Sequence, residues 1–208
     1  MKLAVFGPTG RTGRLILEQA LATGHEVTAF TRHPEAVPAR QGLTVVAGST
    51  NAPALLAQAI AGRDAVLCAL GGHPLRRREN VCSTAMRAIV AVMQDCKVRR
   101  IVAMSTFGAG ETRPHVGWFA RTVLFGSILR SEVADKEAME ATLSGTTLDW
   151  TVVRVGLLTD DPQRMVWRAA DDGSIRGMGK IARADVAAFM LAQLHHSPWV
   201  RRSPVIMY

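Results

Sequence analysis

Three glycines, Gly7, Gly10 and Gly13, recur at intervals of three directly after a short apolar run, 3–6. A glycine turn between a strand and a helix lets main-chain N–H groups approach a phosphate, and the helix N-terminus adds partial positive charge. We expect Gly7 to form the tight turn, Gly10 to admit the phosphate, and Gly13 to let the helix pack closely on the strand. The turn therefore predicts a diphosphate site, with a purely structural turn as the alternative.

The other residues of this turn agree with that chemistry. Thr9, Arg11 and Thr12 add side-chain hydrogen-bond donors, whereas Pro8 lacks a backbone N–H. The spacing is G-x-x-G-x-x-G and differs from the G-x-G-x-x-G of long-chain dehydrogenases. The prediction therefore depends on the position of the turn, between the first strand and the first helix of the chain.

The end of the second apolar run indicates which dinucleotide this turn would bind. About 20 residues beyond such a turn, a carboxylate grips the ribose of NAD, whereas a basic residue accepts the 2′-phosphate of NADP. The sequence there is Phe30-Thr31-Arg32-His33 and contains no acid. Arg32 can form two parallel hydrogen bonds with a phosphate. We expect NADP(H) to be preferred over NAD(H); a solvated arginine at a strand end is the alternative.

Apolar runs rich in β-branched residues alternate with amphipathic segments along the chain. The runs predict strands at 3–6, 26–31, 43–47, 65–70, 101–104 and 148–153. The amphipathic segments predict helices at 13–23, 52–61, 80–96, 116–143 and 185–195. Several strands are apolar at nearly every position, which is typical of a parallel sheet with helices on both faces. The expected fold is α/β, a doubly wound Rossmann-type parallel sheet in a single domain, 1–208.

Two polar segments containing glycine, 108–116 and 160–179, follow the fifth and sixth predicted strands. Ligands bind at the carboxyl edge of such sheets. We therefore expect substrate loops at about 107–118 and 157–180, with disordered surface excursions as the alternative. Asp185 is interpreted as stabilising the first turn of the last helix.

Composition limits the class of protein. No apolar run approaches the roughly 20 residues that span a bilayer, and the first residues lack the apolar core of a signal peptide. We expect a cytoplasmic protein without membrane contact. The net charge of +8 suits an anionic partner, but no nucleic-acid-binding motif accompanies it. A phosphorylated cofactor or an anionic substrate is therefore preferred over nucleic acid.

The cysteines, Cys68, Cys82 and Cys96, are three in number and form no C-x-x-C pair. We expect buried reduced thiols and no metal site. The oligomeric state stays open, with a monomer slightly favoured.

Five segments of the chain carry a resemblance to a known family. They are VFGPTGRTG (5–13), GRDAVLCALGG (62–72), RRIVAMSTFGAG (99–110), DKEAMEATLSGTTLDWTVVRVG (135–156) and ARADVAAFML (182–191). Together they resemble the atypical short-chain dehydrogenase/reductases. The subgroup is the NAD(P)H-binding proteins typified by biliverdin reductase B, or flavin reductase, together with the NmrA-like proteins. The likeness extends over nearly the whole chain and is specific for the fold and the cofactor site, much less for the substrate.

The resemblance implies a role for each matching residue. The pyrophosphate contacts would be Gly7, Thr9, Gly10, Arg11, Thr12 and Gly13, and the 2′-phosphate contact would be Arg32. Leu70, Gly71 and Gly72 would lie beside the adenine-side ribose, Ser105 near the nicotinamide, and Val155, Gly156 and Leu157 along the nicotinamide face. Ser105 and Thr106 also suit a simple role as strand-end caps.

Three departures from the family pattern matter. Ser49 replaces the usual aspartate near adenine, so that contact is weaker or replaced. Val155 replaces a proline after the sixth strand. The Tyr-x-x-x-Lys pair of the larger superfamily is missing, because the only tyrosine is Tyr208 and the residue four before Lys136 is Glu132.

Without a tyrosyl acid, ketone reduction loses its usual proton donor. Hydride transfer to a flavin, quinone or tetrapyrrole mainly requires close placement, because the acceptor spreads the charge. We therefore expect an NADPH-dependent reductase of a flavin-like, quinone or other conjugated small-molecule acceptor. Ser105 would position the carboxamide or polarise the acceptor, with Thr106 as its alternative.

Lys136 would steer an anionic acceptor or bind a ribose hydroxyl; otherwise it is an exposed lysine paired with Glu132 or Glu140. His115, Trp118 and Phe119 would border the acceptor or belong to the core. A non-catalytic NmrA-like sensor of the dinucleotide is the main alternative function, and an isomerase or epimerase is a third.

Overall fold

The computed structural model describes residues 1–71, 80–116, 130–195 and 197–208. Its main sheet has the strand order β3-β2-β1-β4-β5-β6-β10-β8. The strands are β1 Lys2–Phe6, β2 Glu26–Thr31, β3 Leu43–Ala47, β4 Ala65–Cys68, β5 Arg100–Thr106, β6 Asp149–Val155, β8 Arg168–Ala170 and β10 Val205–Met207. All neighbouring strands pair in parallel except β8, which runs antiparallel to β10. The order reverses beside β1, as in a doubly wound fold.

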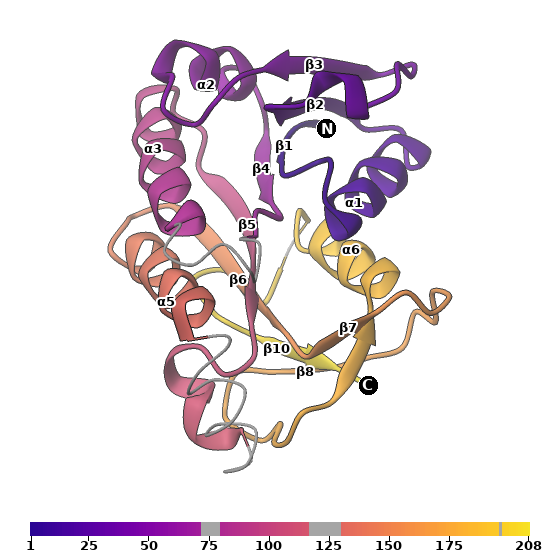
Figure 1. The fold of residues 1–208 in the computed structure, drawn as a ribbon, viewed down its shortest axis with the longest axis vertical. Coiled ribbons are helices and arrows are strands. Elements are labelled where there is room, and N and C mark those ends of the chain that lie inside the picture. Colours follow the sequence, from indigo (N-terminus) through magenta and orange to yellow (C-terminus); the bar gives the residue numbers. More distant parts are fainter. Residues whose placement is uncertain (72–79, 117–129, 196) are drawn as a thin grey trace.

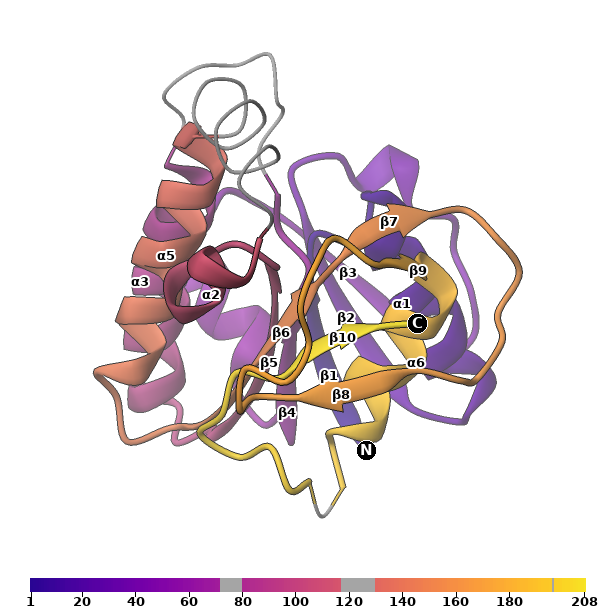
Figure 2. The same ribbon diagram turned by 90° about the horizontal axis from the view of Figure 1, so that it is seen from below.

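Helices cover both faces of this sheet (Figures 1 and 2). Helices α1 Arg11–Ala22 and α6 Arg183–Ala192 form one layer. Helices α2 Pro53–Ile60, α3 Val81–Asp95 and α5 Arg130–Ser144 form the other. One core cluster of buried apolar side chains lies under each layer. The predicted α/β class, with a parallel sheet buried on both faces, is confirmed.

The central strands end at other residues than predicted, so several expected site residues have a different position relative to the strand ends. β4 ends at Cys68, two residues early, so that Leu70 lies in the connection after the strand. β5 and β6 extend to Thr106 and Val155 because they pair along their whole length, with Thr106 opposite Val155. Ser105 and Thr106, expected at the end of the fifth strand, form the last two positions of β5.

Of the predicted helix 116–143, the described residues show α5 over Arg130–Ser144, and 117–129 lie outside the described residues. Before it, Gly110–His115 forms a 3₁₀ helix and Val116 is extended. Gly108 and Gly110 have φ of +99° and +53°, and Pro114 lies inside the short helix. These backbone preferences stop a regular α-helix from forming there.

The segment 157–180 is more regular than expected. β7 Leu157–Thr159 pairs in parallel with β9 Lys180–Ala182 in a separate two-stranded sheet. β8 lies between them in sequence but joins the main sheet through β10. These four three-residue strands were missed because each is too short to show a periodic pattern.

No helix in the described ranges has both the length and the apolar character needed to cross a bilayer. The same residues contain no group of three or more His, Cys, Asp or Glu side chains arranged to hold a metal ion.

Candidate functional site

The glycine turn between β1 and α1 has the backbone geometry that the sequence predicts. Gly7 has φ +81°, and a Cβ added to it would lie 2.8 Å from the carbonyl oxygen of Ala69. A Cβ on Gly13 would collide with the carbonyl oxygen of Gly7. At Gly10 the one atom within 4 Å of such a Cβ is the Gly7 oxygen at 3.4 Å, so this position is less crowded than the other two. Two glycines are thus required by packing, and the third leaves room in front of the helix.

The N-terminus of α1 is open to an anion. The first intrahelical hydrogen bond runs from the N–H of Arg14 to the oxygen of Gly10. Gly10 is the N-cap and supplies no side-chain cap, and the first turn holds no acidic residue. Within the described chain, the N–H groups of Arg11, Thr12 and Gly13 have no main-chain acceptor. These donors and the helix dipole favour a phosphate group here.

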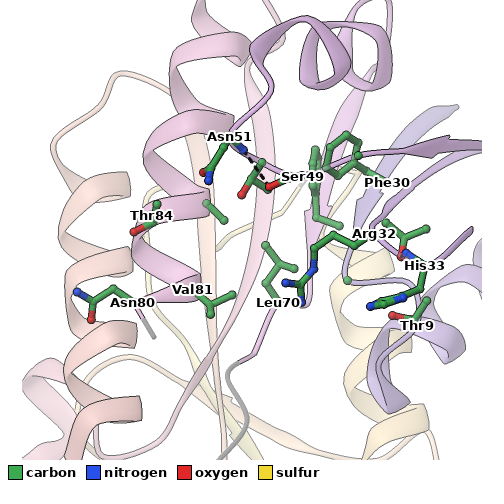
Figure 3. Close-up of a pocket in the computed structure, with 16 residues that line it drawn as sticks. Thr9, Phe30, Arg32, His33, Ser49, Asn51, Leu70, Asn80, Val81 and Thr84 are labelled. Atoms are coloured by element: carbon green, nitrogen blue, oxygen red, sulfur yellow. Dashed lines mark hydrogen bonds between the residues drawn. The ribbon is translucent and has the colours of Figure 1, made fainter. Parts of the chain in front are cut away.

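A cavity of about 310 Å³ lies beside this turn, between the carboxyl ends of β1, β2 and β3 and the start of α3 (Figure 3). Its lining comes from five segments of the chain. The lining residues are Phe6, Gly7, Thr9, Phe30, Thr31, Arg32, His33, Gly48, Ser49, Thr50, Asn51, Leu70, Asn80, Val81, Thr84 and Ala85. Predicted site residues Gly7, Thr9, Arg32, Ser49 and Leu70 are therefore brought together around one cavity.

Arg32 supplies the positive charge of this cavity. Its exposed side chain extends into the space between Leu70 and His33 (Figure 3). Across the described part of the chain, no carboxylate forms a salt bridge with it. The neighbouring His33 Nδ1 lies 3.2 Å from Glu35 Oε1. The guanidinium is thus free to form a pair of hydrogen bonds with an incoming phosphate.

Several polar lining residues were missed from the sequence. Asn51 lies beside Ser49, and its N–H donates a long hydrogen bond of 3.4 Å to Ser49 Oγ, whereas Asn80 and Thr84 line the cavity from the start of α3 (Figure 3). All of them follow β3 or begin α3. Because the carboxyl ends of parallel strands meet at one edge, the positions after β3 and β4 could have been included on topology alone.

Helix α5 carries two buried charged side chains, which bind main-chain groups near the ends of β4 and β5 and at the start of α3. Lys136 is only 4% exposed, and its Nζ donates to the carbonyl oxygens of Leu70 at 2.7 Å and Met104 at 2.8 Å. The alternative of an exposed lysine paired along its own helix is wrong. The adjacent Asp135, also 4% exposed, accepts hydrogen bonds from the N–H groups of Cys82 and Ser83 at 2.7 and 2.9 Å. It therefore caps α3, a role that the sequence did not indicate.

Ser105 lies in a buried polar network, and its side chain is 1% exposed. Its hydroxyl donates to Oε1 of Glu140. Arg154 binds the same carboxylate, with Nη2–Oε2 at 2.7 Å and Nε–Oε2 at 3.2 Å. The Ser105 proton is thus committed to Glu140. Thr106, half-buried and with only a 3.3 Å contact to the oxygen of Phe107, is the more accessible hydroxyl at the end of β5.

The residues at and just after the end of β6 contribute unequally. Val155 is 4% exposed and belongs to the core. Gly156 is buried so tightly that a Cβ would collide with the carbonyl oxygen of Gly179. Leu157 is 52% exposed and presents its side chain to solvent. Among these three predicted residues, only Leu157 offers a side chain to a ligand.

The remaining predicted residues lie after β4, in the short helix after β5, or outside the described residues. Gly71 is exposed after β4. His115 is partly buried against Gly173, whose added Cβ would lie 2.7 Å from the His115 ring. Gly72, Trp118 and Phe119 lie outside the described residues.

Asp185 does more than stabilise its own helix turn. Fully buried, it accepts hydrogen bonds from the N–H groups of Arg164 at 3.0 Å and Met165 at 2.8 Å and from the Tyr208 hydroxyl at 2.6 Å. Burial and the hydrogen bond to Asp185 raise the pKa of Tyr208. Tyr208, the only tyrosine of the sequence, is therefore occupied in holding the loop after β7.

The cysteines are free thiols. Cys68 and Cys82 are buried as expected, and Cys96 is partly exposed. Burial raises the pKa of Cys82 to about 11. The neutral thiol is a poor nucleophile, so this side chain serves packing.

The chain is similar to known proteins. A model of the family described as NAD(P)H-binding matches residues 7–197. The uncharacterized protein YwnB of Bacillus subtilis is 34% identical over 110 residues, which is 53% of this chain and 48% of that protein. The matched region thus spans about half the length of this relative.

Solved structures show the same fold over the full chain. A short-chain dehydrogenase/reductase from Veillonella parvula in complex with NADP has a TM-score of 0.83 at 18% identity, covering 100% of this chain and 94% of that one. ChuY from Escherichia coli O157:H7, an anaerobillin reductase, has a TM-score of 0.84 at 22% identity, covering 100% and 97%.

Proposed function

The chain belongs to the NAD(P)H-binding family, and from that premise we propose that it is an NADPH-dependent reductase of a flavin-like, quinone or other conjugated acceptor. The observation that carries the proposal is Arg32, a cation without a carboxylate partner among the described residues, in a cavity that adjoins the glycine turn. No acid ends β2, where an NAD ribose would require one.

The residues fit a dinucleotide along the carboxyl edge of the sheet. The cavity at Arg32 and Ser49 suits the adenosine half, and the open N-terminus of α1 suits the diphosphate. Gly71, Thr106 and Leu157 would border the remaining half. The bound cofactor supplies the hydride. The relative that holds NADP in the same fold supports this assignment.

Lys136 would act from beneath the site. Two of its three N–H bonds are occupied by Leu70, just after β4, and Met104, near the end of β5, where the cofactor would cross the sheet edge. It fixes these strand ends and places a positive charge below them. The third N–H would then serve a ribose hydroxyl or an anionic acceptor, as the resemblance implies.

The acceptor class follows from the lack of a free proton donor at Ser105 and Tyr208. Ser105 donates its proton to Glu140, and Tyr208 is occupied by Asp185, so neither supplies a proton to a substrate carbonyl. A conjugated acceptor takes hydride onto a delocalised system and can take its proton from water, so it needs mainly placement. ChuY, an anaerobillin reductase on the same fold, supports a reductase of this kind.

One observation favours a second candidate, the non-catalytic dinucleotide sensor. Thr106 is the only predicted hydroxyl left accessible at the end of β5 in the described structure. A protein that binds the dinucleotide and only alters the activity of a protein partner needs no proton donor, so one accessible hydroxyl would be sufficient.

The test is a titration with NADPH and NADH, followed by the nicotinamide absorbance after addition of FMN, riboflavin or a quinone. A reductase binds NADPH more tightly and oxidises it only when an acceptor is present. Thr106→Val, which removes the hydroxyl and keeps the shape, should lower turnover without weakening NADPH binding. Tight binding without oxidation by any acceptor would select the sensor, and no binding of either dinucleotide would refute both.

A further inference from the structure

One exposed carboxylate connects the glycine turn to the segment after β7. Asp160 Oδ2 lies 3.1 Å from Nη1 of Arg11, the first residue of α1. Its other oxygen, Oδ1, lies 2.7 Å from Nη1 of Arg183, the first residue of α6. A single acid thus bridges two arginines at the starts of two helices.

The two ion pairs are unequal. The Arg183 side chain is 9% exposed, whereas those of Arg11 and Asp160 are 71% and 64% exposed. A partly buried arginine keeps its partner, but an ion pair between two exposed side chains is weak and easily exchanged. Asp160 is therefore anchored on Arg183, and Arg11 is the partner that can leave.

The segment that carries Asp160 has a second anchor. The N–H groups of Arg164 and Met165 donate to the buried carboxylate of Asp185, so the segment does not need Arg11 to stay in place. Loss of the contact with Arg11 changes the electrostatics at α1 and leaves the segment fixed at its other end.

Arg11 stands where the proposed diphosphate would lie. The first turn of α1 contains no acid, so Asp160 brings a carboxylate to this helix terminus from a distant part of the chain. A diphosphate and this carboxylate compete for the same guanidinium, and they also repel each other. In contrast, Arg11 without Asp160 could form two hydrogen bonds with phosphate oxygens.

We propose that Asp160 is a resident counter-ion of the diphosphate subsite. It holds Arg11 in the free protein, yields Arg11 to the dinucleotide, and remains on Arg183. Its negative charge lowers the affinity for the dinucleotide and speeds its release. A reductase must exchange oxidised for reduced cofactor at every turnover, so faster release serves the reaction. This inference rests on the proposed function.

The test is Asp160→Asn, which removes the charge and keeps the shape. NADPH should bind about 2- to 5-fold more tightly at low ionic strength, mainly through slower dissociation in stopped-flow measurements, with the gain falling as salt is added. Asp161→Asn is the matched control, because Asp161 accepts a hydrogen bond from Thr159 at 2.9 Å and has no salt bridge to a described residue. The affinity of the Asp161→Asn variant for NADPH should not change.

Arg11→Ala completes the cycle. It should weaken the binding of NADPH and NADH, and Asp160→Asn should then give a smaller gain, because only the direct repulsion between Asp160 and the diphosphate remains. Weaker or unchanged binding in Asp160→Asn, an equal gain in Asp161→Asn, or a gain that persists undiminished without Arg11 would each overturn the counter-ion role. These results leave dinucleotide binding by the wild type intact. A wild type that binds neither dinucleotide overturns the proposed function, and this inference with it.

Discussion

Replacing Arg32 with alanine should separate the two nicotinamide dinucleotides by affinity. The guanidinium reaches into the cavity, is exposed, and forms no salt bridge with a described residue, so its removal disturbs little else. Hydrogen bonds to a charged group contribute about 1.5–3 kcal/mol. NADPH should therefore bind about 10- to 150-fold more weakly. NADH has no 2′-phosphate, and its affinity should change by less than about twofold.

Calorimetric titration of each dinucleotide measures both affinities directly. Arg40→Ala is the control for overall charge, because Arg40 pairs with Glu18 at 3.7 Å and does not line the cavity. Arg32→Lys keeps the charge without the two-pronged geometry and should fall between alanine and wild type. Equal losses for NADPH and NADH, or no loss for either, would refute the 2′-phosphate role.

Three further experiments test other parts of the structure. Gly10→Val should abolish binding of both dinucleotides while the melting temperature of the free protein changes little, since an added Cβ makes a single contact, at 3.4 Å, with the Gly7 oxygen; retained affinity would place the phosphates elsewhere. Glu140→Gln should lower the free energy of unfolding by about 3–5 kcal/mol in denaturant titrations, because it leaves the buried Arg154 charge uncompensated; a change near zero would contradict the importance of this pair. At about pH 8 a thiol reagent should modify Cys96 well before Cys82, whose raised pKa of about 11 keeps it protonated in the fold; a reversed order, measured by peptide mapping, would contradict it.

Much of the fold could be predicted because its central strands are buried on both faces. The predicted run 26–31 matches β2, and the run 43–47 matches β3 at the edge of the sheet, since β-branched and aromatic residues between polar turns favour a strand. The glycine turn was predictable for a related reason. A Cβ at Gly7 or Gly13 would strike backbone atoms, so only glycine fits at these positions. The residue type alone therefore marks the turn in the sequence.

The side chains that meet across long sequence distances could not be predicted in the same way. Lys136 binds the oxygens of Leu70 and Met104, and Asp135 caps a helix more than one element away. Helical spacing alone suggested an exposed lysine paired along α5. Only the packing of α5 on the sheet turns that face inward.

The sequence by itself determined an α/β chain with a glycine turn at its first helix and a basic residue, Arg32, at the end of its second strand. These features are local, because they depend on periodicity, on the absence of a Cβ and on the type of one residue. The tertiary structure alone decided that Ser105 is committed to Glu140, that Lys136 is buried, and that Asp160 reaches Arg11. Each of these contacts joins residues 32 or more positions apart, and such contacts form only when the sheet brings its strand ends to one edge.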